Sequence, residues 1–138
     1  MKRIGAVLIS HGSLATELLE AARQVCGATQ HIVAVSIDWN DDVTRAEARI
    51  ERAIKDVGDG SGVLLLTDMF GGTPTNIAAM FLKEGETEVI TGMNLPMVLK
   101  IATQNREASL ALFAEEVENQ GKKSIYRAGE LLVPKSVK

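Results

Sequence analysis

The chain has 138 residues, of which 46% are hydrophobic, 24% charged and 4% aromatic. This length suits one domain with its own core, and the composition lacks the polar bias of disordered chains. The formal net charge is −3 at pH 7 and the 15 Lys and Arg residues are scattered along the chain, which argues against a nucleic-acid-binding surface. We therefore expect a single domain over residues 1–138 and no nucleic-acid partner.

The N-terminal segment and the single cysteine both indicate in which compartment of the cell the protein is found. The apolar run after Lys2 and Arg3 ends at Ser10, which is too short for the hydrophobic region of a signal peptide or for a membrane span. Cys26 has no partner for an internal disulfide, and its place on the apolar side of a predicted helix suits a buried thiol better than a nucleophile. We expect a cytoplasmic protein.

Short aliphatic runs predict buried parallel strands, because they do not alternate with polar residues. They cover residues 4–9, 32–37, 63–66 and, more weakly, 89–90. Apolar residues at helical spacing predict helices between and after them. These helices lie at 14–25, at 43–57, at 76–83 after a Gly-Gly-Thr-Pro turn, from Pro96 onward, and at 106–120 with Gly121 as the stop. Residues 124–127 are expected to form one last short strand.

This alternation predicts an α/β fold with an open, mostly parallel sheet and helices on both faces. Right-handed crossovers lay each helix back on the sheet. Ligand crevices in such sheets open at the carboxyl ends of the strands, where the strand order reverses. Functional residues are therefore expected at those ends.

The first strand leads into Ser10-His11-Gly12-Ser13, just before a helix that Ser13 or Thr16 would cap. A helix N-terminus offers free N–H groups and positive dipole charge, which suit a phosphate held by or transferred through an imidazole. With an unperturbed pKa of roughly 6.5, imidazole is a competent nucleophile near neutral pH. His11 is therefore the predicted nucleophile, and Gly12 allows a close approach.

The third strand ends in Asp68, which would lie beside His11 if the first and third strands are neighbours. A carboxylate that accepts from one ring nitrogen leaves the other nitrogen free to attack. The glycine-containing turn after Asp68 offers backbone amides and a threonine hydroxyl to phosphoryl oxygens. The predicted phosphate-binding residues are Gly12, Ser13, Gly71, Gly72 and Thr73.

Three segments carry a resemblance to a known family. They are Ser10-His11-Gly12-Ser13, Asp68-Met69-Phe70-Gly71-Gly72-Thr73-Pro74 with Asn76, and Thr91-Gly92-Met93-Asn94-Leu95-Pro96-Met97. In order and spacing they resemble the EIIA domain of the mannose family of the bacterial phosphoenolpyruvate-dependent sugar phosphotransferase system (PTS). The resemblance covers nearly the whole chain.

The resemblance implies a phosphotransferase component that works through a phosphohistidine and needs no cofactor. His11 would accept a phosphoryl group from the histidine phosphocarrier protein HPr and pass it to a IIB component, for sugar uptake or for regulation. Asp68 would hold the ring, and Thr73 would lie near the phosphate. Because the chain ends at Lys138, we expect the IIB component to act in trans.

The family fold also implies an assembly. It has four parallel strands and a C-terminal antiparallel strand that is exchanged between the subunits of a homodimer. Residues 124–127 would supply that strand here. This role is compatible with peripheral association with a membrane permease. It is also compatible with a regulatory phosphocarrier that takes no part in transport.

Other functions fit the sequence less well. A His-Gly-Ser segment after a first strand also resembles small metal chelatases, with His11 as a metal ligand, but that function needs a second ligand. Asp68 is the natural opposite position, His31 is misplaced, and no His/Cys cluster has ligand spacing, so we expect no metal site. The motifs of serine hydrolases, dinucleotide-binding folds and P-loops are missing. The phosphocarrier subunit that serves dihydroxyacetone kinase shares the fold, but the Gly-Gly-Thr-Pro turn favours the mannose type.

Two further segments allow more than one interpretation. Residues 38–42 follow the second strand, and they form either a helix N-cap or a contact with a partner, the cap being favoured. Residues 93–97 follow the fourth strand, and they either line the crevice or dock a partner surface through flexible methionines, or else pack in the core.

Overall fold

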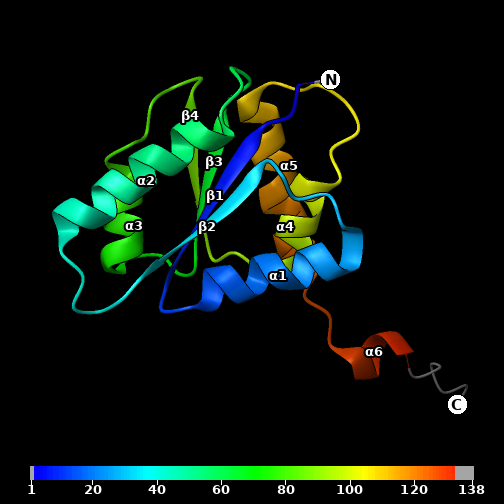
Figure 1. The fold of residues 1–138 in the computed structure, drawn as a ribbon. Coiled ribbons are helices and arrows are strands. Elements are labelled where there is room, and N and C mark those ends of the chain that lie inside the picture. The colour runs from blue at the N-terminus through cyan, green and yellow to red at the C-terminus, as the bar shows by residue number, and fades with distance from the viewer. Residues whose placement is uncertain (1, 133–138) are drawn as a thin grey trace, which may run out of the picture.

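The computed structural model describes residues 2–132, in which strands and helices alternate (Figure 1). The elements are β1 (Gly5–His11), α1 (Leu14–Cys26), β2 (Ile32–Ile37), α2 (Val43–Val57), β3 (Val63–Thr67), α3 (Gly72–Ala79), β4 (Thr87–Thr91), α4 (Leu95–Ala102), α5 (Leu110–Lys123) and α6 (Ala128–Leu132). The four predicted parallel strands are confirmed.

The strands form one parallel sheet in the order β2-β1-β3-β4. In register, Ala6 of β1 lies between Ile32 of β2 and Leu64 of β3. The chain passes from β1 to β2 on one side and then crosses to β3 on the other, so the strand order reverses between β1 and β3. The carboxyl ends of these two central strands therefore flank the place where such sheets bind ligands.

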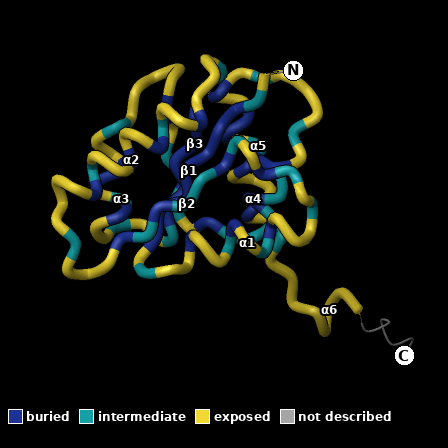
Figure 2. The backbone as a smooth tube through the Cα atoms, in the orientation of Figure 1, coloured by how far each residue is buried: buried dark blue, intermediate teal, exposed yellow. Residues whose placement is uncertain are grey.

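Helices cover both faces of the sheet, as predicted. Helices α2 and α3 lie on one face, and α1, α4 and α5 on the other (Figure 1). Successive strand residues point to opposite faces, so Val7 and Leu65 pack with α2 and α3, whereas Leu8 and Leu64 pack with the other layer. Figure 2 shows β1 and β3 buried at the centre of the molecule. The two strands that carry the site are thus its most enclosed elements.

The last long helix differs from the prediction at both ends. It begins at Leu110 and is capped by Ser109, whose hydroxyl accepts a hydrogen bond from the Leu112 amide. The helix continues past Gly121 to Lys123. Gly121 is buried, and a Cβ there would lie 2.5 Å from the Met97 sulfur. The prediction of Gly121 as a stop was wrong, because this glycine lets α5 pack closely on α4.

The predicted strand at residues 124–127 was also wrong for this single chain. The segment from Ser124 to Arg127 is irregular and leads to α6, which projects from the body and buries none of its residues (Figure 1). A strand this short needs a sheet edge to pair with. In residues 2–132 no strand pairs with the outer edge of β4.

Helix α3 begins earlier than predicted, at Gly72 instead of residue 76. Pro74 lies in its first turn, where a missing N–H costs nothing. The glycine pair therefore belongs to the start of the helix, with Gly71 as the N-cap.

None of the helices in the described part of the chain is long and apolar enough to span a bilayer.

Candidate functional site

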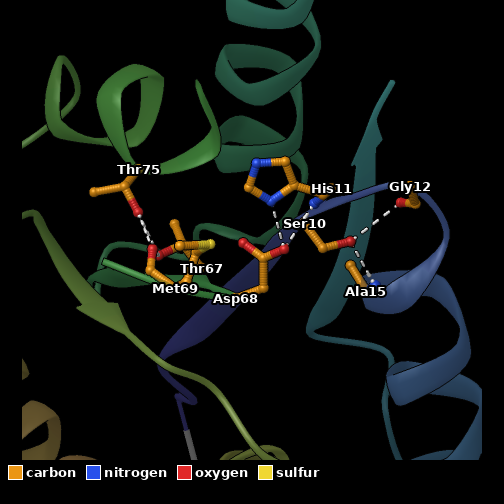
Figure 3. Close-up of polar contacts among 8 residues, drawn as sticks. All are labelled: Ser10, His11, Gly12, Ala15, Thr67, Asp68, Met69 and Thr75. Carbon is orange, nitrogen blue, oxygen red and sulfur yellow. Dashed lines mark hydrogen bonds and ion pairs between the residues drawn. The ribbon is translucent and has the colours of Figure 1, made fainter. Parts of the chain in front are cut away.

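His11 and Asp68 meet at the carboxyl ends of β1 and β3. The Nδ1 of His11 lies 2.7 Å from Oδ2 of Asp68, and the backbone N–H of His11 donates to the same oxygen at 2.9 Å (Figure 3). The two residues come together because β1 and β3 are neighbours and Asp68 directly follows β3. One carboxylate oxygen thus holds both the ring and the main chain of the histidine.

The electrostatics of this pair define the tautomer. Burial raises the pKa of Asp68, but the hydrogen bonds from His11 and the charge of its ring outweigh burial and hold that pKa below its ordinary value. An ionised carboxylate only accepts hydrogen bonds, so Nδ1 carries a proton, and in the neutral ring this leaves a free lone pair on Nε2. The Asp68 side chain is 11% exposed and the His11 side chain 50%. The imidazole is therefore half exposed while its carboxylate partner is sheltered.

The start of α3 lies against the imidazole. A Cβ on Gly72 would lie 3.1 Å from Cε1 and 3.2 Å from Nε2 of His11, and Gly72 has φ +78°. Any larger residue would be strained and would press on Nε2 of His11. The first amides of a helix have no partner within it. An N-terminus with free donors and positive dipole charge is therefore adjacent to Nε2.

The segment after His11 is held differently from the prediction. Ser13 occupies the N-cap position of α1 but makes no side-chain cap bond, and the Thr16 hydroxyl instead lies 3.2 Å from that of Ser36. Buried Ser10 takes the capping role, because its Oγ accepts from the amide of Ala15 at 2.7 Å and donates to the carbonyl of Gly12 at 3.2 Å (Figure 3). The predicted caps were wrong.

The remaining predicted residues lie in the turns that follow β1 and β3. Gly12 has φ +53°, and a Cβ there would meet nothing within 4 Å. Thr73 is exposed in the first turn of α3. The hydroxyl that bonds in this turn belongs to Thr75, which contacts Thr67 and the carbonyl of Met69 (Figure 3). Neither Thr67 nor Thr75 was predicted, although a polar residue closing an aliphatic strand is a signal that marks Thr67.

The second histidine lies elsewhere. His31 precedes β2 at the opposite end of the sheet, and its Nε2 is 2.9 Å from the carbonyl oxygen of Ile101 in α4. Burial lowers its pKa, an effect that this hydrogen bond partly offsets. Among the residues that the structure describes, no group of three or more His, Cys, Asp or Glu side chains is arranged to hold a metal ion. Hence His31 does not join His11 and Asp68 in one ligand set.

Comparison with known proteins identifies the family. The family model EIIA-man, described as the PTS system fructose IIA component, matches residues 5–118. The chain belongs to the EIIA-man family. It is 29% identical over 108 residues to the PTS system fructose-specific EIIA component of Bacillus subtilis, with 78% of this chain and 74% of that one covered. It is 28% identical over 106 residues to the PTS system sorbose-specific EIIA component of Lacticaseibacillus casei, with 76% of each covered.

A solved structure agrees with this assignment. The mannose/sorbose specific IIA subunit of the phosphotransferase system from Enterococcus faecalis matches with a TM-score of 0.80 and 26% identity, covering 91% of this chain and 94% of that one. The resemblance drawn from three sequence segments is thus confirmed. EIIA components are phosphotransferase components, so membership of the family supports a phosphocarrier role in a sugar PTS.

The edge of the sheet that carries His11 has an exposed apolar rim, which consists of Leu14, Trp39, Met69 and Phe70. Their exposures are 51%, 96%, 53% and 84%. Each residue closely follows the end of β1, β2 or β3, so all four lie at the edge of the sheet that carries His11. Exposed apolar side chains gathered in this way are typical of a surface that binds another protein.

The structure distinguishes the interpretations left open for two segments. In residues 38–42, Asp42 caps α2 by accepting from the amide of Thr44 at 3.0 Å, while the neighbouring Trp39 projects into solvent. The favoured cap is confirmed, and Trp39 remains free for contact. In residues 93–97, Met93 and Met97 are 9% and 3% exposed and pack in the core.

Proposed function

We propose that this EIIA domain is a phosphocarrier that accepts a phosphoryl group on Nε2 of His11 from phospho-HPr and passes it to a IIB component in trans. The observation that carries the proposal is the 2.7 Å bond between Nδ1 of His11 and Asp68, next to a helix N-terminus. The bond supplies the tautomer that leaves Nε2 nucleophilic, and α3 supplies donors for an anion.

The transfer step follows from this arrangement. The lone pair of Nε2 attacks the phosphorus carried by the donor's histidine, and an N–P bond forms as the donor's N–P bond breaks. The donor ring leaves with that electron pair. His11 keeps its Nδ1 proton, so its ring becomes cationic, and the Asp68 carboxylate stabilises that charge. Transfer to the IIB component is the reverse attack by an acceptor nucleophile.

The phosphoryl oxygens need donors that the turns around His11 supply. We assign this role to the backbone of Gly71 and Gly72 and the Thr73 hydroxyl at the start of α3, and to Gly12 and Ser13 at the start of α1. Helix N-termini stabilise phosphate through free amides and dipole charge. Both helices begin beside the histidine, so one anion would be shared between them.

The rim is the proposed docking surface for HPr and for the IIB component. Trp39 and Phe70 are the most exposed of its side chains, and exposed aromatic side chains are typical anchors of protein interfaces. Both partners need access to the same Nε2, so they would bind the same face in turn. This role places the domain in the cytoplasm, with at most peripheral contact to a membrane permease.

The test is phosphorylation with purified components. Incubation with phosphoenolpyruvate, Enzyme I and HPr should give one acid-labile, base-stable phosphate per chain. His11→Ala should abolish the label, whereas His31→Gln should retain it. Label that survives in the His11 variant, or that maps to His31, would contradict the proposal.

We further propose a homodimer in which the C-terminal segment crosses to the second subunit. The proposal is supported by an open edge of β4 and a groove of about 690 Å³ beside it, lined by β4, α5 and Ile125. The segment that leaves α5 carries exposed apolar side chains. They are Ile125, Tyr126, Leu131 and Leu132, at 79%, 66%, 61% and 75% exposure. Pairing with the edge of a second copy would bury these side chains.

Sedimentation equilibrium tests the assembly. The proposal expects twice the chain mass of 14.8 kDa, and truncation after Ser124 should dissociate the dimer while leaving α5 complete. A stable monomer at micromolar concentration would reject the dimer. A dimer unaffected by the truncation would reject only the exchanged segment.

A further inference from the structure

A pair of threonine hydroxyls joins the end of β3 to the first turns of α3. Thr67 is fully buried, and its Oγ1 lies 2.8 Å from Oγ1 of Thr75. Thr75 Oγ1 lies 2.6 Å from the carbonyl oxygen of Met69, whereas Thr67 Oγ1 lies 3.4 Å from it (Figure 3). Each hydroxyl has one proton to donate. The distances therefore define a chain in which Thr67 donates to Thr75 and Thr75 donates to Met69.

This hydroxyl chain holds a loop that has little else to hold it. The loop, residues 68–71, runs from the orienting carboxylate to the N-cap of α3. Met69 and Phe70 are 53% and 84% exposed, so their side chains do not anchor it in the core. Its other tie is through Asp68 to His11. The carbonyl of Met69 is therefore the point at which the middle of the loop is fixed.

The orientation of the Met69 carbonyl determines where the next amide points. The described chain has no cis peptide bonds, and in a trans peptide the N–H and the carbonyl point in opposite directions. With the Met69 carbonyl directed at Thr75, the N–H of Phe70 is directed away from the hydroxyls. Within residues 2–132 the amides of Phe70 and Gly71 donate to no protein acceptor. They are free donors in the turn that leads into α3, whose first residue, Gly72, lies against the imidazole.

We propose that Thr75, backed by Thr67, is a positioning residue for phosphoryl transfer at His11. It holds the loop so that the free amides at the start of α3 face the phosphoryl group. Thr75 touches neither the histidine nor the donor and acts through the backbone of Met69. The inference rests on the proposed phosphocarrier role, since it assigns the loop the task of receiving phosphoryl oxygens.

The test compares matched variants that remove or keep this hydroxyl. Thr75→Val removes the donor at nearly constant volume, and Thr75→Ser retains it. Thr103→Val is the control, because the Thr103 hydroxyl also donates to a carbonyl, that of Leu99, at 2.7 Å but at the far end of α4. Transfer from phospho-HPr to His11 is measured by rapid quench over a range of donor concentrations.

We expect Thr75→Val to lower kcat about 10-fold, with a smaller change in KM, because misplaced donors cost rate even when docking persists. Thr75→Ser and Thr103→Val should both transfer at the wild-type rate. Thr67→Val removes only the inner hydroxyl and should give a smaller loss, and it provides the test if Thr75→Val fails to fold. A merely structural role would lower stability without this loss of kcat.

A second readout needs no donor. In 15N relaxation-dispersion spectra of the unphosphorylated protein, the amides of Phe70, Gly71 and Gly72 should gain exchange broadening in Thr75→Val and not in Thr75→Ser. Unchanged loop amides, or wild-type transfer by a folded Thr75→Val protein, would overturn the inference. If wild-type His11 accepts no phosphate, the proposed function fails, while these spectra still report whether the hydroxyls hold the loop.

Discussion

Replacing Asp68 with asparagine removes the charge that acts on His11 and keeps the shape of the side chain. Both hydrogen bonds from His11, at 2.7 and 2.9 Å, go to the same oxygen, Oδ2. The backbone N–H of His11 can only donate a hydrogen bond. The asparagine must therefore turn its amide oxygen, and not its NH2 group, toward His11. The variant therefore keeps an acceptor for Nδ1 and the correct tautomer. It loses the negative charge, and it places the asparagine NH2 at the position of Oδ1, which is buried and has no hydrogen-bond partner within residues 2–132.

The magnitude follows from which bond changes during transfer. The bond to the backbone is the same before and after phosphorylation, whereas the ring becomes cationic. A hydrogen bond between charged groups contributes about 1.5–3 kcal/mol, compared with about 1 kcal/mol for a neutral one. Since about 1.4 kcal/mol corresponds to a factor of ten, we expect a loss of roughly 10- to 100-fold, the range seen when groups that orient a histidine are removed.

The assay is rapid-quench transfer of labelled phosphate from phospho-HPr to the Asp68→Asn protein. Asp59→Asn is the control for a carboxylate far from His11, because Asp59 accepts backbone hydrogen bonds from Arg3 on Oδ2 and from Ser61 on Oδ1 at the opposite end of the sheet. The control should transfer normally. Transfer by a folded Asp68→Asn protein at the wild-type rate would refute the assignment, as would an equal loss in the control.

Three further predictions concern other parts of the chain. Gly72→Ala should reduce phosphoryl transfer at least 10-fold in the same assay, because the alanine Cβ would lie 3.2 Å from Nε2 of His11 and the backbone φ at this position is +78°. Unchanged transfer would contradict this packing. Burial lowers the pKa of His31 in the folded state, so the contribution of this residue to the free energy of unfolding is fully present above about pH 6.5 and is lost as the pH falls toward the folded-state pKa. His31→Gln should flatten this pH dependence when the free energy of unfolding is measured by urea denaturation, and an unchanged slope would oppose the assignment. Gly121→Ala should destabilise the protein by about 1–3 kcal/mol in the same urea assay, because its Cβ would lie 2.5 Å from the sulfur of Met97, and full stability would show that α4 and α5 can separate freely.

The sequence was sufficient for the features that depend on local pattern. Aliphatic runs are buried because central parallel strands have helices on both faces, so the four strands could be predicted. The pairing of His11 with Asp68 required one more condition, that β1 and β3 are neighbours. Chain order alone does not determine strand order, so this part of the site remained conditional until the fold was known.

The features that could not be predicted depend on contacts between distant segments. Whether a glycine ends a helix or lets another helix approach depends on what lies beside it, and for Gly121 that neighbour is Met97 of α4. The start of α3 was placed too late, which left Thr75 in a turn and concealed its bond to Thr67. Residues 124–127 show the same limit, because a strand exists only where an edge receives it.

The cap of α1 has a consequence for how the site opens. The group that satisfies the first turn of this helix belongs to Ser10, a residue of the central strand β1, rather than to the helix or its own N-cap. Most helix termini fray independently, but this one loses its cap only when the end of β1 also moves. Local opening around His11 is therefore coupled to the innermost part of the sheet, and the amide of Ala15 should exchange with solvent as slowly as those of the strands.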